Sequence, residues 1–371
     1  MSETDEDELD AITVLGEHLI NTILLEEPLD IVKAIVAAGA PVWYQNESEG
    51  ISCLHAAVYI QDLDLVKLLL QEGAVWNAAD YLQMTAGDIA LSFNNEAIYT
   101  IIRDAGIRAE LLLSLLSSQT PVSRSDSAMI LKTSDDTAAA SSQVFLSSEL
   151  RFVVDEHGQD ICMLNIKGGE EIGVMMGWET EIMRETVAKL CLDREPTGSL
   201  KILNVGFGLG IIDTLFQSLS PALHVIIEAH PDVLKHMKQL GWYEKPGVKI
   251  LEGKWQDYID TEQLASLVSD GGFNLVYTDP FSEDFAALRH FFKSIPALLS
   301  PNSRFSFFNG LGGTNNMFYD VSTKIAYIQL ANAGFDVEWS VVDVSQQRKQ
   351  WGKSRPYFTV PTYRLPVCRK K

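Results

Sequence analysis

The chain has 371 residues, 46% of them hydrophobic and 21% charged, which is typical of a folded protein with room for two domains. Its net charge of −21 argues against direct binding to nucleic acid, which needs clustered Lys and Arg, and favours a basic partner. No stretch reaches the ~18 apolar residues of a membrane span, and the first ten residues lack the pattern of a signal peptide. We therefore expect no membrane insertion, and a cytoplasmic and nuclear location. We expect neither a disulfide framework nor a metal site, because four cysteines lie scattered without C-x-x-C spacing: Cys53, Cys162, Cys191 and Cys368.

A repeat runs through the first third of the chain. Residues 52–57 (SCLHAA) and 85–90 (TAGDIA) occupy equivalent places 33 residues apart, which is the period of the ankyrin unit, a turn followed by two short helices. Residues 63–70 have the pattern of the second helix of such a unit. Gly73 follows this segment as a helix stop would. Glycines recur at similar spacing, at Gly39, Gly73 and Gly106. The sequence predicts a short ankyrin-like domain over residues 1–115 that binds proteins; the alternative is a generic helical bundle.

Residues 116–142 are rich in Ser and Thr, which predicts a linker. From 143 to 371 strands and helices alternate, which predicts an α/β domain with a mostly parallel sheet covered by helices on both faces. The expected strands are 201–205, 224–228, 248–251, 274–278, 303–308, 335–342 and 357–360. The expected helices include 181–192, 231–240, 284–299 and 321–333. The last two strands have no helix between them, so we expect them to form an antiparallel pair at one edge.

A glycine-rich turn follows the first of these strands. Gly206, Gly208 and Gly210 precede an apolar helix start, an arrangement that brings backbone close to a nucleotide-like ligand. The third glycine comes one residue earlier than in the dinucleotide fingerprint, so pyrophosphate binding is disfavoured. Glu228 closes the next strand, where its oxygens can accept hydrogen bonds from two ribose hydroxyls. A surface glutamate is the alternative.

Three further side chains carry possible chemistry. Trp255 follows the third strand, where an indole can cover an adenine face, although an ordinary core position is equally compatible with the sequence. Asp279 follows the fourth strand, and Glu179 lies beside a tryptophan. Two carboxylates can hold a guanidinium by paired hydrogen bonds, because that group is planar and permanently charged; a solvated or helix-capping carboxylate is the alternative. These residues alone support a methyltransferase for a basic acceptor.

Five segments in order resemble the motifs of guanidinoacetate methyltransferase. They are 174–183 (VMMGWETEIM), 203–208 (LNVGFG), 227–230 (IEAH), 253–255 (GKW) and 277–279 (YTD). With an ankyrin-type region in front, the chain resembles the type IV protein arginine N5-methyltransferases, which methylate the δ-nitrogen of arginine. The resemblance implies a Rossmann-like class I fold for residues 143–371, S-adenosyl-L-methionine as methyl donor and S-adenosyl-L-homocysteine as product. It also implies a monomer that acts on a basic, arginine-containing protein, suggested by the family to be ribosomal.

The resemblance also implies residue roles. Glu179 and Asp279 would hold the guanidino group, and Asp279 would accept its proton. The acceptor pocket would be lined by Glu179, Asp279, Asn309, Gly310 and Leu311. The cofactor would contact Phe145, Phe152, Met175, Gly206, Phe207, Gly208, Leu209, Gly210, Ile211, Glu228, Ala229, His230, Lys254, Trp255 and Asp279.

Two positions depart from the family pattern: Asn204 stands where an acid is common, and Pro280 follows Asp279. No double-acid hairpin of the common arginine methyltransferases is recognisable, which disfavours methylation of the ω-nitrogens. Two alternatives remain. One is a small-molecule guanidino N-methyltransferase whose repeats serve only as a scaffold, and the other is an inactive ankyrin adaptor.

Overall fold

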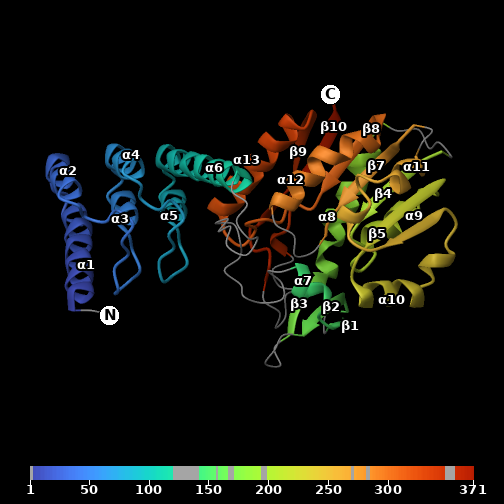
Figure 1. The fold of residues 1–371 in the computed structure, drawn as a ribbon, viewed down its shortest axis with the longest axis horizontal. Coiled ribbons are helices and arrows are strands. Elements are labelled where there is room, and N and C mark those ends of the chain that lie inside the picture. Colours follow the sequence, from blue (N-terminus) through green and yellow to red (C-terminus); the bar gives the residue numbers. More distant parts are fainter. Residues whose placement is uncertain are drawn as a thin grey trace. The chain divides into compact units, whose positions relative to one another are not determined.

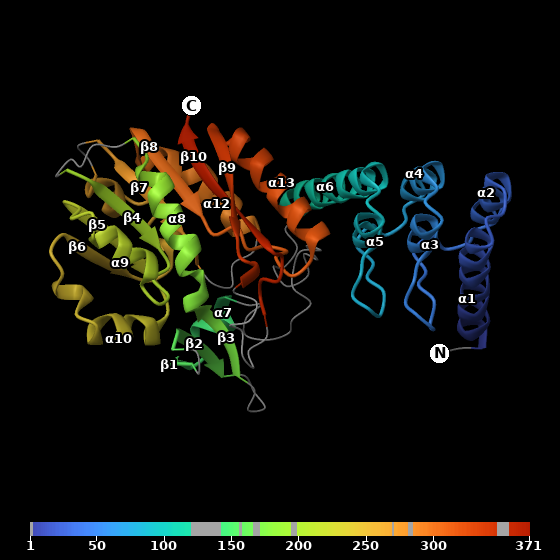
Figure 2. The same cartoon turned by 180° about the vertical axis from the view of Figure 1, so that it is seen from behind.

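The computed structural model describes residues 3–119, 142–155, 158–165, 171–193, 199–268, 271–280, 285–346 and 356–371. They form two compact units (Figures 1 and 2). The first unit comprises Met1–Ile130 with Asn315–Ser322, and the second comprises Leu131–Thr314 with Thr323–Lys371. Most of the predicted linker, residues 120–141, lies outside the described residues.

The first unit contains successive helices with a shared start signal. The helices are α1 (Glu3–Leu24), α2 (Leu29–Ala37), α3 (Cys53–Tyr59), α4 (Leu63–Gln71), α5 (Ala86–Ser92) and α6 (Glu96–Gln119). Ser52 and Thr85 are the N-caps of α3 and α5, and each side chain accepts a hydrogen bond from the backbone N–H three residues later. The side chains of His55 and Asp88 bond back to the caps, so both helices begin with a reciprocal capping box. These equivalent caps correspond to the repeat seen in the sequence.

Two loops, residues 38–52 and 72–85, extend from the same edge of this unit and are called the finger loops below (Figures 1 and 2). Bridges Gln45↔Ser52 and Ala79↔Thr85 close them. Tyr81 links the two loops, because its backbone N–H donates to the Glu49 carbonyl at 2.9 Å and its hydroxyl to the Glu47 carbonyl at 3.1 Å. Neighbouring repeats therefore present a joined edge.

Gly106 differs in structure from the two other recurring glycines. Gly39 and Gly73 follow α2 and α4 with φ of +96° and +94°, the left-handed conformation of a helix stop, but Gly106 lies within α6. A Cβ at Gly106 would lie 2.8 Å from Cε3 of Trp76. Glycine is therefore needed there for close packing against an indole.

Residues Asn315–Ser322 join the first unit from far along the chain. The ring of Phe318 meets Trp76 edge-on with centroids 5.8 Å apart. Asn315 Nδ2 donates to Asp88 Oδ2 at 2.5 Å, and the hydroxyl of Tyr99 donates to the carboxylate of Asp320. The start of α13 (Asn316–Asn332) thus covers apolar and polar groups of the last repeat.

The second unit is built on a seven-stranded sheet in the order β6-β5-β4-β7-β8-β10-β9. The strands are β4 (Lys201–Val205), β5 (Leu223–Glu228), β6 (Val248–Glu252), β7 (Phe273–Thr278), β8 (Leu299–Phe307), β9 (Phe335–Asp343) and β10 (Thr362–Lys370). The first five in sheet order are parallel, and β10 is antiparallel to both β8 and β9. An antiparallel pair lies at one edge as predicted, but the partner of β9 is β10 and not residues 357–360. The prediction of a strand at 357–360 is wrong. The N–H groups of Thr359 and Val360 both donate to the Gly313 carbonyl, and not to a neighbouring strand.

Helices cover both faces of this sheet. They are α8 (Thr180–Cys191), α9 (Ile211–Gln217), α10 (Pro231–Gln239), α11 (Glu262–Ser266), α12 (Phe285–Ser294) and the rest of α13. Met183 of α8 and Phe216 of α9 share a buried cluster with Leu275. Phe292 of α12 packs on Phe305, which pairs with Val276 and so lies on the opposite face from Leu275.

A second, smaller sheet was not predicted. It is antiparallel in the order β1 (Leu150–Val154), β2 (Asp160–Asn165), β3 (Glu171–Met176), and follows α7 (Ser142–Leu146). Cys162, Leu164 and Val174 pack in one buried cluster with Val233 and Met237 of α10. This sheet ends immediately before Glu179.

One buried and one exposed tryptophan, one in each finger loop, provide a test of this packing. We expect Trp76→Ala to lower the free energy of unfolding by about 3 kcal/mol, because Trp76 is 4% exposed and its loss leaves a cavity beside Phe318. Trp43→Ala should change it by less than about 0.5 kcal/mol, because Trp43 is 57% exposed. Denaturant unfolding of both variants measures the difference. Equal losses would contradict the packing described for the first unit.

Candidate active site

The glycine turn forms at the carboxyl end of β4. Gly206, Gly208 and Gly210 have φ of +90°, +57° and +70°, which L side chains rarely adopt. A Cβ at Gly206 would lie 2.5 Å from the backbone oxygen of Asp279, so glycine allows the turn to touch the end of β7. At Gly208 a Cβ would meet only the Met175 side chain, 3.3 Å from its sulfur. The turn therefore brings half-buried backbone next to Met175 and Asp279, an arrangement that a bound cofactor could use.

A buried polar network supports this turn from below. Asn204 Nδ2 donates to the Gly206 carbonyl at 2.9 Å and to Asp213 Oδ2 at 2.8 Å. The other oxygen of Asp213 lies 3.0 Å from His224 Nε2, and both side chains are fully buried. Burial raises the pKa of Asp213, which His224 and Asn204 oppose. An acid at 204 would face the Asp213 carboxylate, so the departure at Asn204 suits this network.

Glu228 ties the turn to β5. Its Oε2 accepts the N–H of Phe207 at 2.9 Å, and its Oε1 accepts those of Ala229 and His230 at 2.7 Å each. Burial raises the pKa of this carboxyl, and the backbone donors lower it. The predicted ribose contact stays a prediction, which the remaining lone pairs of the two oxygens allow.

His230 and Phe145 lie together near the turn. His230 is the N-cap of α10, and its Nε2 lies 3.0 Å from the Phe145 carbonyl. The two rings are tilted with centroids 4.8 Å apart, and both residues are buried. Phe145 thus reaches the cofactor side of the sheet through α7, as the resemblance implied, while its contact with a cofactor stays a prediction.

The other aromatic candidates have protein partners. Trp255 is buried against His290 and Phe291 of α12, with ring centroids 5.3 and 5.2 Å away. Phe152 stacks on His236 at 3.9 Å. Lys254 is exposed and precedes the short 3-10 helix η4 (Trp255–Asp257). An adenine contact from these residues is not contradicted, but Trp255 is also a core residue.

Glu179 and Asp279 form the chemical centre of the site. Glu179 ends the 3-10 helix η2 (Gly177–Glu179) and precedes α8, yet its side chain makes no capping hydrogen bond. Burial raises the pKa of Glu179, and the negative charge of Asp279 raises it further, against a hydrogen bond from Tyr357. Burial likewise raises the pKa of Asp279. Glu179 and Asp279, which are 100 residues apart in the sequence, therefore lie close enough to interact in a poorly solvated site.

Tyr357 is the functional candidate that sequence analysis missed. Its hydroxyl donates to Glu179 Oε1, and its ring lies 5.8 Å from that of Trp178. Thr359 holds this segment, because its N–H donates to the Gly313 carbonyl at 2.7 Å and its hydroxyl to the Thr314 carbonyl at 3.0 Å. No motif surrounds Tyr357, so only the fold reveals its partner.

A buried phenol lies close to the same pair. Tyr277 is two residues before Asp279 on β7, is 1% exposed, and has no hydrogen-bond partner for its hydroxyl among the described residues. Burial raises the pKa of Tyr277 well above its usual value, and the nearby charges of Asp279 and Glu179 add to the rise. The pair thus lies in a site with little solvent to stabilise charge.

Asn309, Gly310 and Leu311 follow β8. Asn309 is buried, and its Nδ2 donates to Thr323 Oγ1 at 3.0 Å and to the Arg364 carbonyl at 3.3 Å. Gly310 and Leu311 are half-buried. Asn309 therefore fixes the loop from within, and the contact of all three residues with an acceptor stays a prediction.

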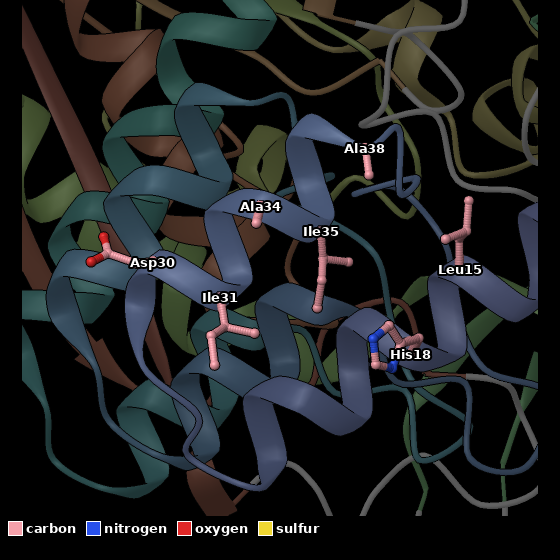
Figure 3. Close-up of a pocket in the computed structure, with 7 residues that line it drawn as sticks. All are labelled: Leu15, His18, Asp30, Ile31, Ala34, Ile35 and Ala38. Atoms are coloured by element: carbon pink, nitrogen blue, oxygen red, sulfur yellow. The ribbon is translucent and has the colours of Figure 1, made fainter.

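A cavity of about 520 Å³ lies elsewhere, in the first unit between α1 and α2 (Figure 3). It is lined by Leu15, His18, Asp30, Ile31, Ala34, Ile35 and Ala38. It lacks paired carboxylates and is not the catalytic site. Across the described ranges no cluster of His, Cys, Asp and Glu is arranged to hold a metal ion, and none of the helices within them has the length and apolar character to cross a membrane.

Comparison with known proteins assigns both parts of the chain. Residues 156–362 match the family described as Guanidinoacetate N-methyltransferase, and residues 22–70 match Ankyrin repeats (many copies). The predicted fold class is confirmed: ankyrin repeats precede an α/β Rossmann-like methyltransferase domain.

Curated relatives that match most of the chain show which methyltransferase family it belongs to. The chain is 38% identical to Protein arginine N-methyltransferase 2 of Cryptococcus neoformans var. neoformans, over 97% of this chain and 96% of that protein. It is 36% identical to the Aspergillus fumigatus protein of the same name, over 91% and 86% of the two chains. For the Saccharomyces cerevisiae protein of that name the identity is 37%, over 82% and 77%. The chain belongs to the family of these proteins named protein arginine N-methyltransferase 2.

The raised pKa values of the carboxyl pair predict a pH dependence of stability. An acid whose pKa is higher in the folded state binds its proton more tightly there, so its contribution falls as pH rises from about 4, the unfolded value, through the folded pKa. Asp279→Asn removes one charge and should therefore stabilise the protein at pH 8 relative to pH 5, by about 1 kcal/mol or more. Denaturant unfolding at both values measures this difference.

Asp257→Asn is the matched control, because Asp257 is an exposed acid of the same unit. It should show no such stabilisation. An equal effect of pH on both variants would mean that Asp279 is not electrostatically strained.

Proposed function

We propose that this chain transfers a methyl group from S-adenosyl-L-methionine to the δ-nitrogen (N5) of an arginine in a protein. The observation that carries the proposal is the desolvated pair Glu179 and Asp279 beside the glycine turn. Two acids that raise each other's cost of ionisation gain most from a cation placed between them. A guanidinium offers that charge together with N–H donors for both carboxylates.

The site residues divide the work. Tyr357 holds the Glu179 carboxylate by its hydrogen bond, so that Glu179 can orient the guanidino group. Asp279 adjoins the turn through its backbone at Gly206, which places an acid where the reacting nitrogen would meet the methyl donor. Asp279 would take the proton that this nitrogen loses as its bond to the methyl carbon forms. Half-burial of both acids limits competing water.

The glycine turn and its neighbours fit S-adenosyl-L-methionine. Gly206 and Gly208 are half-buried and have no side chain to fill the space above the turn, Met175 lies against Gly208, and Glu228 lies at the end of β5. When bound, this cofactor would supply a methyl group on a sulfonium and leave as S-adenosyl-L-homocysteine. A turn kept in shape by Glu228 and Asn204 would need no rearrangement on binding.

The nature of the acceptor rests on three supports. The relatives are named as protein arginine methyltransferases, ankyrin repeats are protein-binding modules, and the net charge of −21 suits a basic protein. The δ-nitrogen follows from the resemblance to type IV enzymes and from the missing double-acid hairpin. The same resemblance supports a ribosomal protein as substrate, met in the cytoplasm or nucleus.

The competing function is methylation of a small guanidino compound, which the guanidinoacetate methyltransferase match favours. Incubation of the protein with labelled S-adenosyl-L-methionine and either guanidinoacetate or purified ribosomal proteins separates the two. Fragmentation mass spectrometry of the labelled protein then distinguishes δ- from ω-methylarginine. Label in guanidinoacetate alone would contradict the proposal, and ω-methylarginine would contradict its N5 part.

Substitution of the acids should abolish turnover and leave cofactor binding intact. Asp279→Asn and Glu179→Gln keep the shape but present N–H donors to a group that is itself all donors. We expect each to lower kcat/KM by on the order of 30- to 1,000-fold, equivalent to about 2 to 4 kcal/mol. Calorimetry with S-adenosyl-L-homocysteine is the control. Normal turnover in both variants would rule out this acceptor site.

Glu228 should control cofactor affinity. Glu228→Ala leaves the N–H groups of Phe207, Ala229 and His230 without their acceptor and removes the ribose partner. We expect binding of S-adenosyl-L-methionine to weaken by about tenfold or more, measured by calorimetry. The exposed Glu244→Ala on η3 (Trp242–Glu244) is the control. Unchanged affinity of Glu228→Ala would remove Glu228 from the cofactor site.

A further inference from the structure

The finger loops carry exposed aromatic and apolar side chains that the catalytic site does not use. Trp43 is 57%, Tyr81 64% and Leu82 82% exposed. Glu47 and Glu49 are exposed as well, and Tyr81 donates hydrogen bonds to both of their carbonyls. These five residues are called the finger surface. Clusters of exposed large side chains next to charged ones are typical of protein-binding surfaces.

The backbone beneath the finger surface is held in place. Tyr81 bonds to the carbonyls of Glu47 and Glu49, as described above. Gln45 Nε2 adds bonds to the carbonyls of Gly50 at 2.6 Å and Ala79 at 2.8 Å. The ring of Tyr81 also covers Gly50, where a Cβ would lie 2.8 Å from Cδ1. A preorganised surface loses little entropy when a partner binds.

The charge around this surface is one-sided. Between Lys33 and Arg103 the sequence has eight acidic residues and one basic residue, Lys67. Lys67 is paired with Asp64 at 3.0 Å. Two of the acids serve the fold, because Asp62 is the N-cap of α4 and Asp88 completes the capping box of α5.

Glu47 and Glu49 do not cap a helix in the part of the chain that the structure describes. Both are exposed, and neither has an ion pair within the part of the chain that the structure describes. Their carboxylates lie on the finger loops, where Tyr81 joins one repeat to the next. The charge available to a partner is therefore negative and lies beside the exposed rings.

We propose that the finger surface binds a basic segment of the protein substrate that is distinct from the methylated arginine. The proposal rests on the proposed function. Lys and Arg side chains suit this surface, because their heads pair with Glu47 and Glu49 or lie over the rings of Trp43 and Tyr81, while their stems cover Leu82. Recognition and chemistry then depend on separate parts of the substrate.

The test compares two acceptors. One is the whole protein identified as methylated in the assay above, and the other is a peptide of about ten residues around its modified arginine, which lacks the rest of the substrate. The variant is Glu47→Gln/Glu49→Gln with Tyr81→Ala. We expect KM for the whole protein to rise by about fivefold or more, with kcat and the peptide kinetics unchanged. The rise of KM with salt should also become shallower.

Glu72→Gln/Glu96→Gln is the matched control, because it removes two exposed acids of the same repeats that lie at helix ends, one directly after α4 and one at the start of α6, and that do not belong to the finger surface. It should leave KM for the whole protein within about twofold. An unchanged KM in the finger-surface variant, or an equal rise in the control, would overturn the proposal. Failure of the wild-type protein to methylate any protein would overturn the proposed function itself, and the finger surface with it. Methylation of the peptide with normal kinetics in the variant shows that the proposed function holds independently.

Discussion

The enforced proximity of Glu179 and Asp279 is the constraint on which the catalytic unit depends. Two carboxyls in a poorly solvated site oppose folding whenever both are ionised. The fold nevertheless holds the two acids together. Asp279 follows the carboxyl end of β7, and Glu179 ends η2 after the small sheet, where Tyr357 holds its carboxylate by a hydrogen bond. A pair of buried carboxyls with raised pKa values is typical of a binding site, and a bound cation would stabilise both of their charges.

The other buried acids of this unit differ in a way that supports this interpretation. Asp213 has Asn204 and His224 as partners, and Glu228 has three backbone N–H groups. These hydrogen bonds stabilise the two carboxylates and hold the glycine turn in place. Among the described residues, the hydrogen bond found for the catalytic pair is the one from Tyr357 to Glu179. The acids with hydrogen-bond partners, Asp213 and Glu228, therefore support the glycine turn. Glu179 and Asp279 are the acids that a positively charged acceptor would stabilise.

Local patterns in the sequence were sufficient for much of this architecture. The G-x-G-x-G turn, the acid at the end of β5, the acid after β7 and the 33-residue repeat depend on nearby residues, and the structure places them as expected. Tyr357 and residues Asn315–Ser322 were not predictable, because their partners are distant in sequence and no motif marks them. The small sheet was missed because its strands are short and only partly buried. Gly106 recurs at the repeat spacing for another physical reason than Gly39 and Gly73, because its close approach to Trp76 requires glycine.

The central claim is that a guanidinium replaces a proton between Glu179 and Asp279. Calorimetric titration of an arginine-containing peptide into the protein with S-adenosyl-L-homocysteine, at pH 7 in buffers of different ionisation enthalpy, counts the protons exchanged on binding. The account predicts release of up to about one proton per peptide, because the bound cation lowers the raised pKa values of the pair. Binding of the peptide without proton release would contradict it.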